Sequence, residues 1–419
     1  MFKKLVCLDK AIDILKSNAS PITDVEVVCL RDALGRVLAE DIIAGVDIPP
    51  FDRAAMDGYA IIAEDTIGAS VENPRILKVV GESDIGRPYR GRVLRGEAVY
   101  VHTGSVIPEG ADAVVPVEYT KLDGVLLYVY ASVASNDNIS RRGEDVRRGE
   151  KVLESGTLLE PFDIALIKAL GMRRVKVYRK PKVSVLACGS ELVDNPEELA
   201  PGKILEYSRE IVIGLAKKFG CEAIDLGICP DDKQELRRYI IRASEVSDIL
   251  VTVGGTSIGK HDIVPKVLEG IGRLLFHGVA IQPGKPVCAG KIGEFLVLGL
   301  PGLPVSTFVC GITLLRSVIE RMSNIRGEIV LPTLRARLSR GIWSKVGVRT
   351  FARVRIRRTK ENYIAEPIMV SGSGVLSSLV LGDGIVIVEE NLEGIPEGIL
   401  VDVVLLRNFL RNSTKHFGD

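Results

Sequence analysis

Residues 248–262 read DILVTVGGTSIGKHD, a stretch that contains a strand, a glycine-rich turn and the start of a helix. Residues 249–253 form a short apolar run rich in β-branched side chains, which is typical of a buried strand. Gly254 and Gly255 end that strand, and Asp262 precedes an apolar segment of helical periodicity. Such a turn can present backbone N–H groups to an anion, and a plain tight turn fits the same residues equally well.

The nearest named pattern for this turn is the phosphate-binding P-loop, G-x-x-x-x-G-K-[ST]. Gly254, Gly259 and Lys260 fit the pattern, whereas His261 occupies the position whose hydroxyl must bind Mg²⁺. Because imidazole is a poor substitute for that hydroxyl, the sequence favours a different phosphate loop, one that also carries the carboxylate of Asp262.

Strand and helix patterns alternate around this turn, beginning near residue 182. Strands are expected at 183–187, 223–228, 249–253, 287–289 and 295–298, and helices at 208–219, after 232 to about 244, from 262 and from about 305. The alternation predicts a parallel sheet with helices on both faces, which is a doubly wound α/β domain. Ligands of such sheets bind beyond the carboxyl ends of the strands, where the segments around Glu191, Asp231, Gly254 and Pro301 fall.

The flanking segments have other patterns, so a multidomain α/β and β protein is expected. Short strands and turns dominate residues 71–133, and strand patterns return after Arg335. The expected boundaries are 1–50 with 139–180 for a split N-terminal helical and linker domain, 51–138 for a β-rich insert, 181–328 for the doubly wound domain and 329–410 for a C-terminal β-barrel.

Composition places this chain of 419 residues among ordinary globular proteins, with 46% hydrophobic residues, 26% charged residues and a net charge of +1. That balance gives no reason to expect nucleic acid or a membrane surface as a partner. Residues 295–315 carry no charge and are long enough to span a bilayer, but glycines and prolines interrupt them. A strand, a loop and a helix are therefore expected there.

The seven cysteines and four histidines are scattered without any ligand spacing. This argues against a disulfide framework and against a zinc site. The first residues, MFKKL, lack the apolar region and cleavage site of a signal peptide. We therefore expect a protein of the reducing cytoplasm.

Five carboxylates lie in turns beside a glycine or at a strand end, namely Asp57, Asp145, Glu191, Asp231 and Asp262. Carboxylates so placed can bind Mg²⁺, which takes oxygen ligands and often bridges to substrate phosphates. Each one alone is more often a simple turn residue, and only their number favours a site.

Two further side chains suit the same chemistry. Lys285 offers a positive charge in a proline-bounded loop, apt for phosphate or an oxyanion, with a surface turn lysine as the alternative. Thr103 offers a hydroxyl. The chain has no G-x-S-x-G or H-E-x-x-H motif, and its few histidines disfavour a histidine mechanism. Metal-assisted phosphoryl or nucleotidyl chemistry is the class that remains.

Six motifs occur in order along the chain. They are FDRAAMDGYA at 51–60, HTGS at 102–105 with PEGADAV at 108–114, RRGED at 141–145, GGTSIG at 254–259 followed by Asp262, PGKP at 283–286 and GLPGLPVS at 299–306. Together they closely resemble the MoeA family, the molybdopterin molybdenumtransferases, which are related to the E-domain of gephyrin. The resemblance extends from near the N-terminus to the last β-domain.

The resemblance implies a four-part homodimer whose α/β domain is similar to the small MogA-like pterin-binding fold. It implies a reaction that takes adenylylated molybdopterin and molybdate, releases AMP and inserts the metal into the dithiolene, with Mg²⁺ as cofactor. The implied partners are a pterin-adenylating MogA-like enzyme or domain and downstream molybdo- or tungstoenzymes. Tungstate is nearly isosteric with molybdate, so the choice of metal stays open.

The resemblance also implies roles for individual residues. The nucleotide phosphates and Mg²⁺ would be served by Glu191, Asp231 and Asp262, and an inter-subunit cleft would be completed from the second subunit. The implied catalytic residues are Asp57, Asp145, Glu191 and Asp262, and the implied metal ligands are Glu191, Asp231 and Asp262. The implied substrate-binding residues are Thr103, Gly254, Gly255, Ser257, Lys285, Pro301, Arg349 and Ser373. Of all these, Asp57, Thr103 and Asp145 would belong to the second subunit.

The chain departs from the family's pattern at five positions, which are Cys188, Arg209, Val253, Gln282 and Leu303. Many members have threonine, asparagine, serine, lysine and asparagine there, respectively, so the departures bear on the details of pterin and anion contact. Three alternatives stay open, namely a pterin- or nucleotide-binding scaffold without transfer activity, a nucleotide pyrophosphatase that shares only the α/β domain, and a P-loop ATPase. The retained carboxylates count against a scaffold, and the motifs outside the α/β domain count against a pyrophosphatase. The mismatch at His261 counts against a P-loop ATPase.

Overall fold

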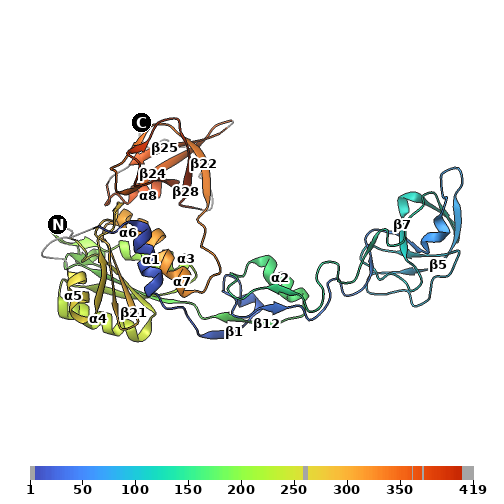
Figure 1. The fold of residues 1–419 in the computed structure, drawn as a ribbon, viewed down its shortest axis with the longest axis horizontal. Helices are drawn as coiled ribbons and strands as arrows, with labels where there is room; N and C mark the ends of the chain where they lie inside the picture. Colours follow the sequence, from blue (N-terminus) through green and yellow to red (C-terminus); the bar gives the residue numbers. More distant parts are fainter. Residues whose placement is uncertain (1–4, 258–262, 361, 370–371, 408–419) are drawn as a thin grey trace. The chain divides into compact units, whose positions relative to one another are not determined.

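The computed structural model describes residues 5–257, 263–360, 362–369 and 372–407 (Figure 1). The chain divides into two compact units. Unit 1 comprises Met1–Glu26, Gly35–Val37 and Val177–Asp419, and unit 2 comprises Val27–Leu34 and Leu38–Lys176. Among the described residues, no helix is both long enough and apolar enough to cross a membrane.

Unit 1 contains a six-stranded sheet in the order β16-β13-β17-β21-β20-β18. Its strands are β13 (Lys182–Cys188), β16 (Glu222–Cys229), β17 (Ile249–Val253), β18 (Arg273–His277), β20 (Cys288–Ile292) and β21 (Phe295–Leu300). The first four strands in the spatial order are parallel, as predicted.

The other two strands correct the prediction of a fully parallel sheet, because β20 and β18 run antiparallel at one edge. A two-residue turn joins β20 to β21, and so short a connection allows only an antiparallel pair. The apolar run at 287–289 predicted β20, whereas β18 was not predicted. Such runs also carry no information about strand direction.

Helices cover both faces of the sheet, as the alternation predicts. One face packs on α1 (Leu8–Asn18), α3 (Ser208–Lys218), α6 (Pro304–Cys310) and α7 (Arg316–Met322), and the other on α4 (Lys233–Val246) and α5 (Ile263–Ile271). Along β17, Val251 faces the first of these cores and Leu250 the second, which explains why apolar residues occupy both sides of the strand. Residues 295–315 form β21, a loop, α6 and a π-helical turn, so the expected strand, loop and helix are confirmed.

The last part of unit 1 is a closed β-barrel, which confirms that prediction. Its strands are β22 (Thr333–Leu338), β24 (Arg349–Arg358), β25 (Tyr363–Met369), β26 (Gly384–Val388) and β28 (Leu400–Leu405). They pair in the order β24-β25-β22-β28-β26, and β26 pairs back to β24, so the ring has no free edge. The other short elements of unit 1 are β14 (Leu192–Val193), β15 (Ile204–Leu205), β19 (Ile281–Gln282), β23 (Ile342–Trp343), β27 (Gly394–Ile395) and α8 (Ser377–Leu381).

Unit 2 contains the predicted β-rich insert as a six-stranded sheet in the order β7-β4-β6-β5-β9-β8. Its strands are β4 (Gly58–Ile61), β5 (Arg75–Ser83), β6 (Glu97–Val101), β7 (Ala113–Pro116), β8 (Thr120–Asp123) and β9 (Leu126–Val129). The remaining elements before β13 are β1 (Val25–Cys29), β2 (Ile42–Ile43), β3 (Arg53–Ala54), β10 (Ile139–Ser140), β11 (Lys151–Leu153), β12 (Arg174–Tyr178) and α2 (Pro161–Ala169). The expected helix after Pro161 is therefore present.

A buried hydroxyl in the central strand gives a stability prediction. Thr252 is fully buried, and within the described part of the chain its Oγ1 has no hydrogen-bond partner. Thr252→Val, which replaces that hydroxyl with a methyl group of similar size, should stabilise unit 1 by about 1 kcal/mol, because an unpaired buried hydroxyl costs about 1–3 kcal/mol. The thermal midpoint should rise by about 2–4 °C.

The matched control is Thr307→Val, which alters an equally buried threonine. Its Oγ1 donates to the carbonyl oxygens of Pro301, at 2.7 Å, and Leu303, at 3.0 Å. This variant should lower the thermal midpoint measured by differential scanning calorimetry. A midpoint that falls in both variants would contradict our description of the Thr252 environment.

Candidate active site

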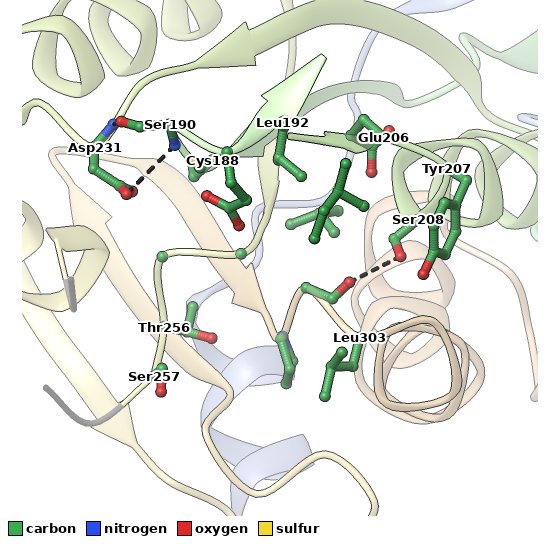
Figure 2. A pocket seen from close by; sticks show the side chains of 18 of the residues that line it. Cys188, Ser190, Leu192, Glu206, Tyr207, Ser208, Asp231, Thr256, Ser257 and Leu303 are labelled. Atoms are coloured by element: carbon green, nitrogen blue, oxygen red, sulfur yellow. Dashed lines mark hydrogen bonds between the residues drawn. The ribbon is translucent and has the colours of Figure 1, made fainter. Parts of the chain in front are cut away.

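The sheet has a topological switch point between β13 and β17. From β13 the chain passes through α3 to β16 on one side, and from β16 it passes through α4 to β17 on the other side. Since α3 and α4 lie on opposite faces, a crevice opens at the carboxyl ends of β13 and β17. A cavity of about 810 Å³ occupies this place, a size suited to a small-molecule ligand (Figure 2).

The cavity is lined by residues from several loops, from the ends of β13 and β17, from β14 and β15, and from the first residue of α3. They are Cys188–Leu192, Gly202, Ile204–Ser208, Asp231, Val253–Ser257, Pro286 and Pro301–Leu303. The predicted site residues Glu191, Asp231, Gly254, Gly255, Ser257 and Pro301 are among them. The structure therefore brings together six of the positions that the sequence selected, from segments far apart in the chain.

The glycine turn lies backbone to backbone against its neighbours. Gly254 has φ +92°, and a Cβ atom there would be 2.3 Å from the Cys188 carbonyl oxygen. Gly255 has φ +67°, and a Cβ atom on Gly302 would lie 3.3 Å from Gly254 Cα. Only glycine fits the Gly254 position, because φ is left-handed and the carbonyl occupies the space of a side chain. The turn therefore keeps its main chain at the cavity wall.

The two acidic loops at the cavity are tied to each other. Asp231 N donates to Ser190 Oγ at 2.8 Å, and Ser190 N donates to Asp231 Oδ2 at 3.4 Å (Figure 2). Gly189 N donates to the Cys229 carbonyl oxygen at 3.0 Å. The carboxylate of Glu191 folds back over Gly189, where a Cβ atom would be 2.7 Å from Oε2. Two carboxylates thus stand at one end of the cavity, next to the glycine turn.

Adjacent aspartates in this region have different tasks. Asp232 is the N-cap of α4, and its Oδ1 accepts from Gln234 N at 2.8 Å and Glu235 N at 2.9 Å. Asp231 lines the cavity instead. The sequence selected Asp231 by its place in the motif, and the structure separates it from the neighbouring capping residue.

A third carboxylate, Glu206, lines the opposite end of the cavity and was not predicted. Its side chain is only 3% exposed, and burial raises its pKa. Arg209 N donates to Glu206 Oε1 at 2.9 Å, and Arg209 Nη2 donates to Asp194 at 2.7 Å. The departure at Arg209 therefore places a buried guanidinium beside the cavity, where it pairs with the half-exposed Asp194 and lies 3.7 Å from the buried Glu206 carboxylate. In the sequence, the only sign was a glutamate just before the helix that begins at Ser208.

Three other predicted residues of unit 1, Lys285, Arg349 and Ser373, are not among the residues that line the cavity. Lys285 is exposed, and its neighbour Pro286 is a lining residue. The Ser373 carbonyl oxygen accepts from Val305 N at 3.0 Å, close to the loop of Leu303. Asp262 lies outside the described residues.

Two arginines of the barrel have contrasting surroundings. Arg349 forms ion pairs with Asp9 at 2.8 Å, Glu390 at 2.7 Å and Glu389 at 2.9 Å, so three carboxylates balance its charge. Its role toward an anion stays a prediction. Arg353 is fully buried, and its Nη2 donates to the Gly372 carbonyl oxygen at 3.4 Å, next to the predicted Ser373. Sequence reasoning did not single out Arg353, because alternation along a strand does not mark which arginine turns inward.

Unit 2 holds the other predicted carboxylates. Asp57 Oδ1 accepts from both the backbone N and the Oγ1 of Thr103, each at 2.7 Å. Both hydrogen bonds lower the pKa of Asp57, and the bond from the backbone N–H has the larger effect. The two predicted residues are therefore joined by hydrogen bonds that hold the Asp57 carboxylate in place. Asp145 is exposed, and its backbone N donates to the Ile48 carbonyl oxygen at 3.1 Å.

The residue before Thr103 gives a prediction for pH dependence. His102 Nε2 lies 2.7 Å from Glu82 Oε1, and this hydrogen bond raises the pKa of the imidazole above 6.5. A raised folded-state pKa means that the pair stabilises the fold fully below the unfolded pKa and that this contribution is lost as pH rises through the folded pKa. Glu82→Gln should shift the His102 titration toward lower pH. NMR titration of the imidazole measures this, with Glu72→Gln as the control that should leave the midpoint unchanged.

The described residues contain no group of three or more histidines, cysteines, aspartates and glutamates arranged to hold a metal ion. Glu191 and Asp231 nevertheless line the cavity together. One or two carboxylates are the usual protein contribution to a Mg²⁺ ion that also binds substrate phosphates. Their oxygens therefore fit Mg²⁺, and the third predicted ligand, Asp262, is outside the described residues.

Fold and cavity define a class first. A doubly wound domain with a glycine turn and carboxylates at its switch point, in one chain with a β-barrel and a β insert, is characteristic of a multidomain α/β protein whose ligand cavity lies at the carboxyl ends of its strands. Three family models match in order: the MoeA N-terminal region (domain I and II) at 6–171, a probable molybdopterin binding domain at 184–321 and the MoeA C-terminal region (domain IV) at 335–406. The chain belongs to the MoeA family of molybdopterin molybdenumtransferases, enzymes of molybdenum cofactor biosynthesis.

Similar proteins span the whole chain. A putative molybdopterin biosynthesis protein of Methanocaldococcus jannaschii is 36% identical over 97% of this chain and 100% of its own length. The molybdopterin molybdenumtransferase of Haemophilus influenzae is 34% identical over 95% of this chain and 98% of its own. The crystal structure of a molybdopterin biosynthesis MoeA protein from Pyrococcus horikoshii has a TM-score of 0.85 and 38% identity, covering 96% of this chain and 100% of that one.

Proposed function

We propose that this chain inserts molybdenum from molybdate into adenylylated molybdopterin and releases AMP, with Mg²⁺ as cofactor. One observation carries the proposal: Glu191 and Asp231 meet the glycine turn in a single cavity at the switch point of the sheet. Carboxylates for a cation beside backbone N–H groups for an anion are what a phosphate ester with its Mg²⁺ requires.

Different residues of the cavity would bind different parts of the substrate and its Mg²⁺. Glu191 and Asp231 would hold Mg²⁺, which would neutralise charge on the phosphates and on the departing AMP. Main-chain N–H groups of the Gly254–Gly255 turn would hold the phosphate itself. At the other end, Leu303 and the aromatic ring of Tyr207 offer apolar surface to a flat ring system. The Ser208 hydroxyl donates to the Gly302 carbonyl oxygen at 2.8 Å and so fixes that wall (Figure 2).

The direct test supplies the purified protein with adenylylated molybdopterin, molybdate and Mg²⁺ and measures AMP by chromatography. AMP should form with molybdate and Mg²⁺ and should cease when Mg²⁺ is chelated. A protein that binds the pterin nucleotide but forms no AMP would instead be a binding scaffold, the alternative that the sequence left open.

We further propose that the active species is a homodimer, in which Asp57, Thr103 and Asp145 of one copy complete the cavity of the other. Mixing two inactive variants tests this. Asp57→Asn mixed with Glu191→Gln should restore about a quarter of the wild-type rate, since half of the randomly paired dimers hold one intact site of two. No recovery in a mixture shown to exchange subunits would contradict the shared site.

The proposed setting follows from the substrates. A MogA-like enzyme or domain would supply the adenylylated pterin, and molybdo- or tungstoenzymes would receive the product in the cytoplasm. Molybdate and tungstate are nearly isosteric, so we propose that both are accepted. Parallel assays with each oxyanion at equal concentration measure the preference, and a complete lack of turnover with tungstate would contradict this part of the proposal.

A further inference from the structure

Two thiols lie side by side beneath the cavity. Cys188 ends β13, Cys229 ends β16, and the two are direct partners in the register of these parallel strands. Both are free and buried, and both belong to the core on the α4 side of the sheet. Cys229 Sγ donates to the Pro230 carbonyl oxygen at 3.3 Å.

The position suits a disulfide. Neighbouring strands lie about 4.7–4.9 Å apart, within the range of about 4.4–6.8 Å between the Cα atoms of disulfide-bonded cysteines. The other buried cysteines lack this relation to Cys188. Cys221 and Cys310 belong to the core on the opposite face, and β17 and β21 separate Cys288 from β13. Only one pair of buried thiols is therefore ready to join without rearrangement of the sheet.

The two thiols differ in access. Cys188 is one of the residues that line the cavity, whereas Cys229 is fully buried and is not among them. Cys188 is thus placed to meet an oxidant first and Cys229 to act as the attacking thiol in the second step.

We propose that Cys188 and Cys229 are a reversible thiol–disulfide site in the wall of the cavity, oxidised by hydrogen peroxide. Cys188 sulfur attacks one peroxide oxygen, the O–O bond breaks, and a sulfenic acid and one water form. Cys229 sulfur then attacks the Cys188 sulfur, the S–O bond breaks, and a second water leaves. Two thiols lose two electrons and two protons, and peroxide is reduced to two waters.

The disulfide would act on the loops of the site. Cys188 directly precedes the segment of Glu191, and Cys229 lies two residues before Asp231. The Cys188 carbonyl also lies against Gly254, so a movement of this residue reaches the glycine turn as well. Joining the two sulfurs therefore changes the placement of both carboxylates. This consequence rests on the proposed function, whereas formation of the disulfide does not.

The first test measures mass alone. The full chain carrying Cys7→Ser and Cys29→Ser, which removes the two exposed thiols, is treated with hydrogen peroxide. Mass spectrometry should show the loss of two hydrogens per chain and, after proteolysis without reductant, a peptide linking Cys188 to Cys229 that dithiothreitol separates. No linked peptide, a linkage through Cys221 or Cys310, or added oxygen at Cys188 without linkage would each overturn the proposal.

The second test measures the consequence. Peroxide should lower AMP release about tenfold or more, and dithiothreitol should restore it, because small displacements of catalytic groups have large kinetic effects. In a Cys188→Ser/Cys229→Ser variant, the rate of AMP release should be the same before and after treatment with peroxide. Full turnover in a protein whose disulfide is complete would overturn the effect on the site. Absence of turnover in every untreated form would contradict the proposed function, while the mass measurement would still decide the disulfide.

Discussion

Asp231→Asn is expected to lower the rate of AMP release by about 10²-fold or more, the scale on which catalytic groups that touch the reacting atoms contribute. The carboxylate lines the cavity beside the glycine turn, and the amide cannot supply its negative charge to Mg²⁺. The fold should change little, since asparagine can still accept the 3.4 Å hydrogen bond from Ser190 N. Steady-state turnover with saturating molybdate measures the effect.

The neighbouring aspartate provides the matched control for this variant. Asp232 caps α4 through bonds to Gln234 N and Glu235 N, and asparagine caps helices about as well as aspartate. Asp232→Asn should therefore stay within about twofold of the wild-type rate, since it leaves the cavity unchanged. Equal losses in the two variants would mean that general charge near α4, and not the cavity carboxylate, sets the rate.

Gly254→Ala is expected to damage both stability and activity. The added Cβ atom would lie 2.3 Å from the Cys188 carbonyl oxygen, with backbone on both sides of the contact, at a φ of +92°. A left-handed conformation alone costs a residue with a side chain about 1–2 kcal/mol. Here the turn must also move, which displaces the N–H groups proposed to hold phosphate. We expect a fall in the thermal midpoint together with loss of AMP release.

Gly293→Ala separates the two effects. Gly293 also has positive φ, +57°, but a Cβ atom there would meet nothing within 4 Å. This control should lower the free energy of unfolding by about 1 kcal/mol, which is the cost of the left-handed conformation alone, and should keep its activity. If Gly254→Ala behaves like Gly293→Ala in both assays, the close contact between the glycine turn and β13 does not matter for function.

Much of the fold follows from residue patterns, for identifiable reasons. The run 249–253 is apolar on both sides because the strand supplies two cores, and such double burial is specific to the middle of an α/β sheet. The loop of Pro301 and Gly302 breaks the charge-free stretch after Leu300, so the strand and helix around it were predictable. The strand β18 was not predicted at all. The direction of β20 was not predictable, because apolar runs look alike in parallel and antiparallel strands.

Site residues were predictable where their position next to the end of a strand can be read from the local sequence. Gly254 directly follows the end of β17 and Asp231 lies two residues after the end of β16, so the rule for ligand sites in α/β sheets selects them. Glu206 was missed because its position depends on β15 and on the burial of Arg209, neither of which has a local sequence pattern. Arg349 and Arg353 show the same limit, since only the packed barrel tells the ion-paired arginine from the buried one.

The stoichiometry of AMP and metal tests the proposed molybdenum transfer most directly. With adenylylated molybdopterin and Mg²⁺, the wild-type protein should release one AMP for each molybdenum that becomes bound to the pterin, measured by chromatography and by elemental analysis of the isolated product. Omitting molybdate should abolish both. AMP released at an undiminished rate without molybdate would contradict the account, since it would make the protein a pyrophosphatase and not a molybdenum transferase.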